Sequence, residues 1–133
     1  MYRDFLTVGL LLRRLHVTER GRAPQAMVRD NWIYVQDESV RVGRVQVFNN
    51  WSPYMVMDEN TVWIGMEYFC REGDALWQLS DEQLVALGRA EMEKLRLASP
   101  AECLDGVVIR MPKASPGYFG AYENFDEVRG YLD

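Results

Sequence analysis

The sequence predicts an α+β domain in which an antiparallel sheet of about five strands packs with two main helices. Several short runs are rich in β-branched and aromatic residues and are bounded by turn-forming residues, as is typical of strands. Two later segments instead place apolar residues at helical spacing. No internal repeat, low-complexity stretch or linker divides the chain, so residues 1–133 are expected to form a single domain.

Three strands are expected before the middle of the chain. Residues 5–17 are rich in valine and leucine and predict a long first strand, which a charged loop at residues 18–30 follows. Residues 31–36 predict a short second strand with β-branched and aromatic side chains. In residues 44–49 arginine and glutamine alternate with valine, which predicts a third strand. Pro53 ends this strand region, because proline has no N–H to donate.

Two more strands are expected further along. Residues 61–70 predict a fourth strand, in which Gly65 indicates a bulge or the close approach of another backbone. Residues 104–112 predict the fifth, which ends at a proline.

Helices are expected at residues 81–96 and 122–132. Ser80 and Gln83 have the spacing of a capping box before the first helix. The second helix has suitably spaced apolar residues up to Leu132. The apolar residues of the first helix fall on one face: Leu84, Leu87, Gly88, Met92 and Leu95.

Composition excludes several classes of function. The net charge of −5 makes nucleic acid and anionic membranes poor partners. The apolar run at residues 8–12 is too short to span a membrane, and no secretory signal is visible, so a cytoplasmic protein is expected. Cys70 and Cys103 are expected to be reduced thiols. His16, the only histidine, has no partner at a ligand spacing, so no metal site is expected.

The first candidate site is the junction at residues 49–54. Asn50, Trp51 and Tyr54 lie at the expected end of a strand, where amides and aromatic rings could bind a planar ligand by hydrogen bonding and stacking. The alternative is a sharp corner, in which the asparagines satisfy the backbone and Trp51 fills the core.

The second candidate is Glu67, a carboxylate within an apolar strand, where burial is costly unless the charge is paired. Strand alternation places Glu67 on one face with Gly65 and Phe69, and Tyr68 on the other. Arg44, Arg71 or Arg110 could neutralise it. It could line a cavity, or it could belong to a cross-strand ion pair on the solvent face.

The third candidate is the segment from Arg110 to Tyr118, which contains two prolines and a glycine. On its own this segment indicates an ordinary loop that leaves a strand.

Together, residues 46–70 and this Arg-x-Pro-x-Ala-x-Pro-x-Tyr segment resemble the substrate-side region of the FAD-dependent amine oxidase superfamily. They are most similar to its members related to protoporphyrinogen oxidase and UDP-galactopyranose mutase. The family's glycine-rich nucleotide-binding turn, Gly-x-Gly-x-x-Gly, does not occur in the sequence. The resemblance therefore covers a middle-to-late portion of the family's length.

The resemblance implies a substrate-binding domain of a flavoprotein, whose FAD is held by another domain of the same polypeptide. The chain alone is then expected to bind no cofactor and to be inactive. Aromatic rings would stack on a small-molecule substrate, Arg110 would contact an anion, and Glu67 would orient groups or balance charge; no catalytic base is assigned. The residues expected to line the cavity are Asn50, Trp51, Tyr54, Glu67, Tyr68, Arg110 and Tyr118.

A different class of function stays open at this point, namely a stand-alone α+β module whose aromatic sheet face binds a partner protein. Two copies of the chain could also dimerise through that exposed sheet face.

Overall fold

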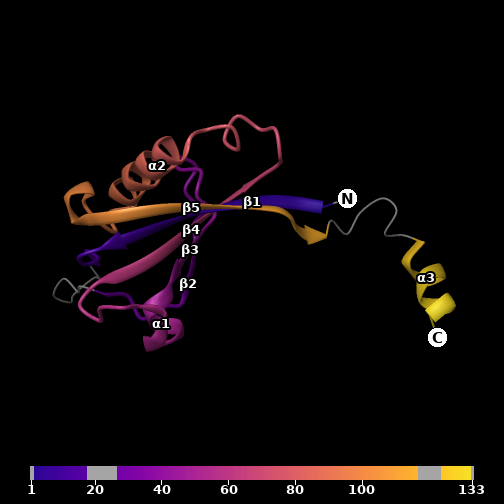
Figure 1. Ribbon diagram of the computed structural model, residues 1–133, viewed down its shortest axis with the longest axis horizontal. Coiled ribbons are helices and arrows are strands. Elements are labelled where there is room, and N and C mark those ends of the chain that lie inside the picture. Colours follow the sequence, from indigo (N-terminus) through magenta and orange to yellow (C-terminus); the bar gives the residue numbers. More distant parts are fainter. Residues whose placement is uncertain (1, 18–26, 117–123, 133) are drawn as a thin grey trace.

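The computed structural model describes residues 2–17, 27–116 and 124–132 (Figure 1). One antiparallel sheet of five strands dominates it, and two helices have seven or more residues, so the predicted α+β class is confirmed. In chain order the elements are β1 (Tyr2–Leu12), β2 (Trp32–Tyr34), β3 (Arg44–Val47), α1 (Phe48–Trp51), the 3-10 helix η1 (Pro53–Met55), β4 (Val62–Cys70), α2 (Asp81–Lys94), the 3-10 helix η2 (Pro100–Glu102), β5 (Cys103–Pro116) and α3 (Phe125–Leu132).

The strand order across the sheet is β2-β3-β4-β1-β5, so β1 lies between β4 and β5, which both follow it in the chain. All four pairings are antiparallel. Figure 1 shows α2 on one side of the sheet and α1 on the other. We call these sides the helix-covered face and the open face.

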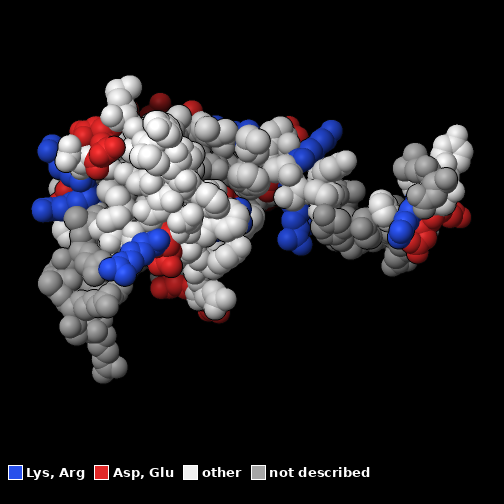
Figure 2. Space-filling view, turned by 90° about the horizontal axis from the view of Figure 1, so that it is seen from below, with Lys and Arg blue, Asp and Glu red and all other residues white. Residues whose placement is uncertain are grey.

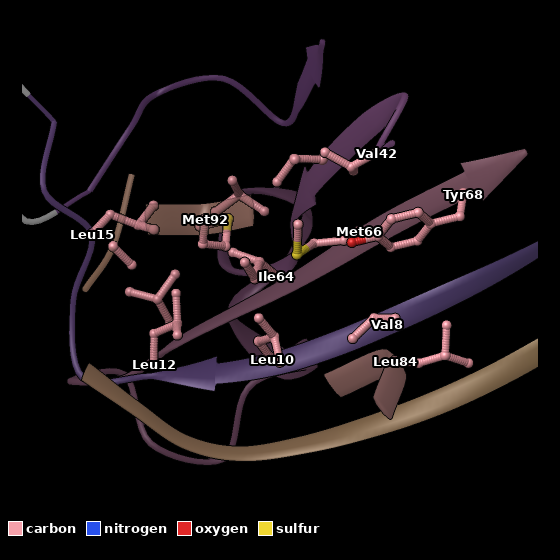
Figure 3. Close-up of a cluster of buried hydrophobic side chains, with 14 of the residues drawn as sticks. Val8, Leu10, Leu12, Leu15, Val42, Ile64, Met66, Tyr68, Leu84 and Met92 are labelled. Carbon is pink, nitrogen blue, oxygen red and sulfur yellow. The ribbon is translucent and has the colours of Figure 1, made fainter. Parts of the chain in front are cut away.

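The core lies between the sheet and α2 (Figure 3). Because successive side chains of a strand point to opposite faces, alternate residues of β1 and β4 enter this core. From α2, Leu84 and Met92 complete it. The buried strand residues are Leu6, Val8, Leu10 and Leu12 of β1 and Val62, Ile64, Met66 and Tyr68 of β4.

Helix α2 begins as the sequence predicts. The Ser80 hydroxyl accepts from the Gln83 N–H, and the Gln83 side chain accepts from the Ser80 N–H, which is the capping box. The helix ends at Lys94, two residues before the predicted end, and Arg96 then adopts a φ of 57°. The second predicted helix is α3, which covers Phe125–Leu132. The first residues of the predicted segment, including Tyr122, lie outside the described residues.

The first and third strands are shorter than predicted. β1 ends at Leu12, because the N–H of Arg13 donates to the carbonyl of Glu102 and no longer to a strand neighbour. β3 ends at Val47, and the next four residues form α1. There the Asn49 side chain replaces the ladder: its oxygen accepts from the Trp63 N–H, and its nitrogen donates to the Thr61 carbonyl. Most of the loop predicted at residues 18–30 lies outside the described residues.

The fifth strand is longer than predicted, because β5 continues beyond Pro112 to Pro116. Its pairing with β1 shifts register between Arg3 and Phe5, and Lys113 adopts a φ of 54°. This local bulge allows pairing to resume after a residue that has no N–H. Part of the expected loop is therefore strand.

Gly65 does not form the predicted bulge, since the pairing of β1 with β4 is unbroken through Gly9 and Gly65. Nor does another backbone approach it. A Cβ at this position would lie 2.8 Å from Cζ of the Phe48 ring, so glycine is needed to seat that ring on the open face.

Gly65→Ala is therefore expected to lower the free energy of unfolding by about 1–3 kcal/mol, because the Phe48 ring must shift. Urea denaturation followed by circular dichroism measures this. Gly130→Ala on α3 is the matched control, since nothing lies within 4 Å of a Cβ there. Equal effects of the two substitutions would contradict the account.

Among the described residues, no helix has the length and apolar character needed to cross a membrane.

Candidate functional site

The two faces of β4 divide the candidate residues. As predicted from alternation, Glu67 lies on the open face and Tyr68 on the helix-covered face. The open face also carries Arg44 and Gln46 of β3, which pair with Glu67 and Gly65 across the strands. Next to them, β2 adds Trp32 and Tyr34 at the sheet edge.

Glu67 is the charged centre of the open face, although only 1% of its surface is exposed. Arg44 lies directly opposite in the ladder and donates from Nε to the carboxylate at 2.8 Å and from a terminal nitrogen at 2.5 Å. The Gln46 amide donates to the other carboxylate oxygen. Of the three arginines considered from the sequence, Arg44 is thus the partner. The predicted cross-strand ion pair therefore forms, but its carboxylate is buried and not exposed to solvent. Burial of this charge requires such a partner.

Three aromatic rings lie close to this pair on the open face. The Arg44 guanidinium lies 4.4 Å from the centroid of the Trp32 ring and 5.8 Å from that of Tyr34, which is cation–π geometry. Trp51 meets Trp32 edge to face, with 5.3 Å between centroids. All three rings are exposed to solvent. We call Trp32, Tyr34, Arg44 and Trp51 the aromatic–arginine cluster.

An apolar hollow lies next to this cluster on the same face. Its volume is about 290 Å³. Figure 2, seen from the side of α1, shows a broad area without charged side chains, with most of the charges at its margins. The hollow is lined by Thr7, Gly9, Phe48, Met55, Trp63, Val107 and Ile109.

The junction at residues 49–54 combines both interpretations made from the sequence. Asn50 donates its amide N–H groups to the carbonyls of Val28 and Asp30, so it fixes a loop, as the corner interpretation predicts. Trp51 does not fill the core, however, but belongs to the exposed cluster. Tyr54, in η1, is 96% exposed. This junction therefore offers rings to a ligand, whereas the Asn50 nitrogen is already bonded.

Tyr68 and Arg110 lie on the opposite side of the sheet. The Tyr68 hydroxyl donates to Glu91 of α2 at 2.9 Å. Arg110, which pairs with the core residue Leu6, donates to the carbonyls of Trp77 and Leu79 and to Asp81, and so holds the segment that leads into α2. The single cavity expected from the sequence therefore does not form, because alternation sends these two side chains to the helix-covered face. Tyr118 lies outside the described residues.

Glu91 of α2, a carboxylate that is only 3% exposed, was not predicted from the sequence. It accepts from the backbone N–H groups of Arg41 (2.7 Å) and Val42 (3.1 Å), in addition to the Tyr68 hydroxyl. Its spacing from Leu84 and Gly88 on one helical face was the available signal. The β2 aromatics Trp32 and Tyr34 were not predicted as site residues either, and Arg44 was predicted only as one of three arginines that could neutralise Glu67.

The buried phenol of Tyr68 gives a test by pH. Burial raises the pKa of the Tyr68 hydroxyl well above its ordinary value, and the nearby Glu91 carboxylate raises it further. The unfolded chain loses this proton near pH ~10, whereas the folded chain keeps it. The resulting stability is therefore complete below that pH and is lost as the pH rises above it. Urea denaturation from pH 8 to 11 should show a steeper loss for the native chain than for Tyr68→Phe; parallel curves would contradict this.

Within the described part of the chain, no group of three or more histidine, cysteine, aspartate or glutamate side chains could hold a metal ion. Cys70 and Cys103 are free thiols.

No family model and no curated protein matches this sequence. Among solved structures, the chain is similar to the crystal structure of reduced UDP-galactopyranose mutase, with a TM-score of 0.64 and 17% sequence identity. The chain shares a fold with part of that enzyme. The match covers 96% of this chain and 25% of the mutase chain. The chain therefore spans about a quarter of the length of that protein, and at this identity the likeness concerns the fold alone.

Proposed function

We propose that this chain is the substrate-side domain of an FAD-dependent enzyme of the class to which UDP-galactopyranose mutase and protoporphyrinogen oxidase belong. The observation that supports this most directly is the likeness of nearly the whole chain to a quarter of the mutase. The open face, with its aromatic–arginine cluster and apolar hollow, is the surface that would cover the reacting ligand.

The flavin-binding half would come from another domain of the same polypeptide. The chain has no Gly-x-Gly-x-x-Gly turn for a pyrophosphate, so its own residues do not fit the nucleotide part of FAD. The exposed rings of Trp32, Tyr34 and Trp51 do fit a planar ring of the substrate that lies against the open face. The flavin would supply the electron chemistry, and this domain would exclude water and orient the small-molecule substrate.

Individual residues have different roles in this proposal. The exposed rings of Trp32, Trp51 and Tyr54 would contact the ligand. Glu67 is too buried to touch it and would act as a positioning residue, holding Arg44 over the Trp32 ring. Tyr68 and Arg110 would support the fold from behind the sheet.

The test uses the complete polypeptide that contains this chain. It is expected to purify with a flavin absorption spectrum, and the double variant Trp32→Ala/Trp51→Ala should raise the substrate KM without changing flavin content. Tyr2→Ala, an exposed aromatic at the far end of β1, is the control. FAD titrated into the 133-residue chain alone should not bind, and the chain alone should be inactive. Tight stoichiometric binding by the isolated chain would overturn this division of roles.

The second candidate function is a stand-alone interaction module, which the exposed apolar open face would also suit. A complete gene that encodes no flavin-binding segment, together with a purified product that contains no flavin, would favour this function over the first.

A further inference from the structure

The outer edge of the sheet at β5 is long, and among the described residues no other strand pairs with it. In the order β2-β3-β4-β1-β5, the two edge strands are β2, with three residues, and β5, with fourteen. On its outer side β5 pairs with no described strand. Residues 103–111 contain no proline and only two charged side chains, of which Arg110 is already bound to the start of α2. Sheet edges of this kind are normally blocked, covered or paired with another strand.

A groove runs beside this edge, between α2 and β5. Its volume is about 570 Å³, and its walls come from Asp81, Glu82, Val85, Ala86 and Arg89 of α2 and from Asp105, Gly106, Val107 and Val108 of β5. Val85 lies directly above Gly106, where a Cβ would approach it to 2.7 Å. In the described part of the chain, Nε of Arg89 is buried and has no hydrogen-bond partner. Along the strand itself, the Gly106 N–H donates to its neighbour Asp105 at 2.8 Å, a local bond that a partner strand would have to replace.

We infer that a second copy of this chain occupies this edge, with its β5 antiparallel to the first across a two-fold axis perpendicular to the sheet. With such an axis, the open faces of the two copies lie on the same side of the combined sheet. Residues that face each other across the two β5 strands therefore point to the same side. With the axis at Val107, that residue faces its own copy, Asp105 faces Ile109 of the partner subunit, and Leu104 faces Arg110 of the partner subunit. The paired segment is residues 103–111, which ends before Pro112.

Helix α2 is self-complementary about the same axis. The two-fold operation makes the two α2 helices antiparallel. Glu82 and Arg89 lie on the groove flank on either side of Val85 and Ala86, so Glu82 faces Arg89 of the partner subunit, and the reverse pair forms equally. These pairs supply a carboxylate to the guanidinium whose Nε has no partner.

The spacing between paired strands is compatible with packing of the two α2 helices against each other. Adjacent strands lie ~4.8 Å apart and α2 packs over both β1 and β5, so the two helices lie about 10 Å apart, a distance at which helices pack. The small side chain of Ala86 is at the crossing. This edge pairing does not rest on the proposed function, and it differs from the dimer through the open face considered from the sequence, because it leaves both open faces uncovered.

The experiment measures the mass of the 133-residue chain by analytical ultracentrifugation over a concentration series. The wild type should show a reversible monomer–dimer equilibrium. Glu82→Arg and Arg89→Glu should each weaken the dimer by about tenfold or more, because like charges then meet twice across the axis. The charge swap Glu82→Arg/Arg89→Glu should restore dimerisation, which a merely structural effect on α2 would not do.

Two further variants keep the inference open to refutation. Val107→Lys places two ammonium groups on the axis and should abolish the dimer, with circular dichroism used to confirm a folded monomer. Glu59→Arg, in the exposed turn before β4, makes the same charge change elsewhere and should have no effect. A wild-type monomer at all concentrations would overturn the inference. So would a dimer insensitive to Val107→Lys, or a charge swap that fails to restore dimerisation lost in the single variants.

Discussion

Glu91→Leu is expected to lower the free energy of unfolding by about 3–5 kcal/mol, the largest effect of any single substitution considered for this chain. The Glu91 carboxylate is buried beneath α2 and accepts three hydrogen bonds, from the Arg41 and Val42 backbones and from Tyr68. Leucine fills the space but leaves all three donors without this acceptor, and two of the three hydrogen bonds, those from Val42 and Tyr68, are buried. Urea denaturation followed by circular dichroism measures the loss.

Three companion variants separate charge from hydrogen bonding at this site. Glu91→Gln keeps one acceptor oxygen and is expected to fall between the wild type and leucine. Tyr68→Phe removes one donor, so it should cost less in the Glu91→Leu background than in the wild type. Glu93→Leu, at an exposed position of the same helix, is the control and should change stability by less than about 0.5 kcal/mol. A Glu91 effect no larger than this control would refute the assignment.

The second large effect is expected at the ion pair of the open face. Arg44→Ala should cost about 3–4 kcal/mol, because it leaves the buried Glu67 carboxylate with only the Gln46 amide as a partner. The arginine side chain is 21% exposed, so water can partly replace it, and the cost should lie below that of a fully enclosed pair. The measurement is again denaturation by urea, at low and at high salt, and the effect should be nearly independent of salt.

Replacing both partners of this pair should be less harmful than replacing one. Arg44→Met/Glu67→Leu removes both charges and is expected to recover most of the stability lost in Arg44→Ala. Arg41→Ala is the control, because the Arg41 side chain is exposed and only its backbone N–H bonds to Glu91. If the double variant were as unstable as Arg44→Ala, the cost would come from packing against Trp32, and the electrostatic account would be wrong.

Much of the fold follows from local patterns. The alternation in β4 and the capping box of α2 depend only on neighbours in the chain, and both are confirmed. The ends of β1 and β5 depend on distant residues instead. β1 stops where Arg13 bonds to Glu102, and β5 continues because a bulge at Lys113 carries it past Pro112. Such long-range hydrogen bonds leave no periodic signal in the sequence.

The site was harder to predict from the sequence than the fold, for a related reason. Three arginines could have neutralised Glu67, and only the strand order, with β3 next to β4, selects Arg44. The same order places Arg110 opposite the core residue Leu6, on the face away from Glu67. Alternation assigns a side chain to one of two faces within its own strand. Which faces of different strands coincide depends on register, and register is set by the assembled sheet.

The position of β1 between β4 and β5 has a consequence for how the chain acquires its structure. Leu6 pairs with Arg110 across 104 residues of sequence (110 − 6), and Leu6 also pairs with Tyr68. Because β1 is synthesised before both of its neighbours, this apolar strand must wait for them before it can pair. Loop closure over such distances is entropically costly, so we expect slow, late folding in which β1 is vulnerable to aggregation until the last strand arrives.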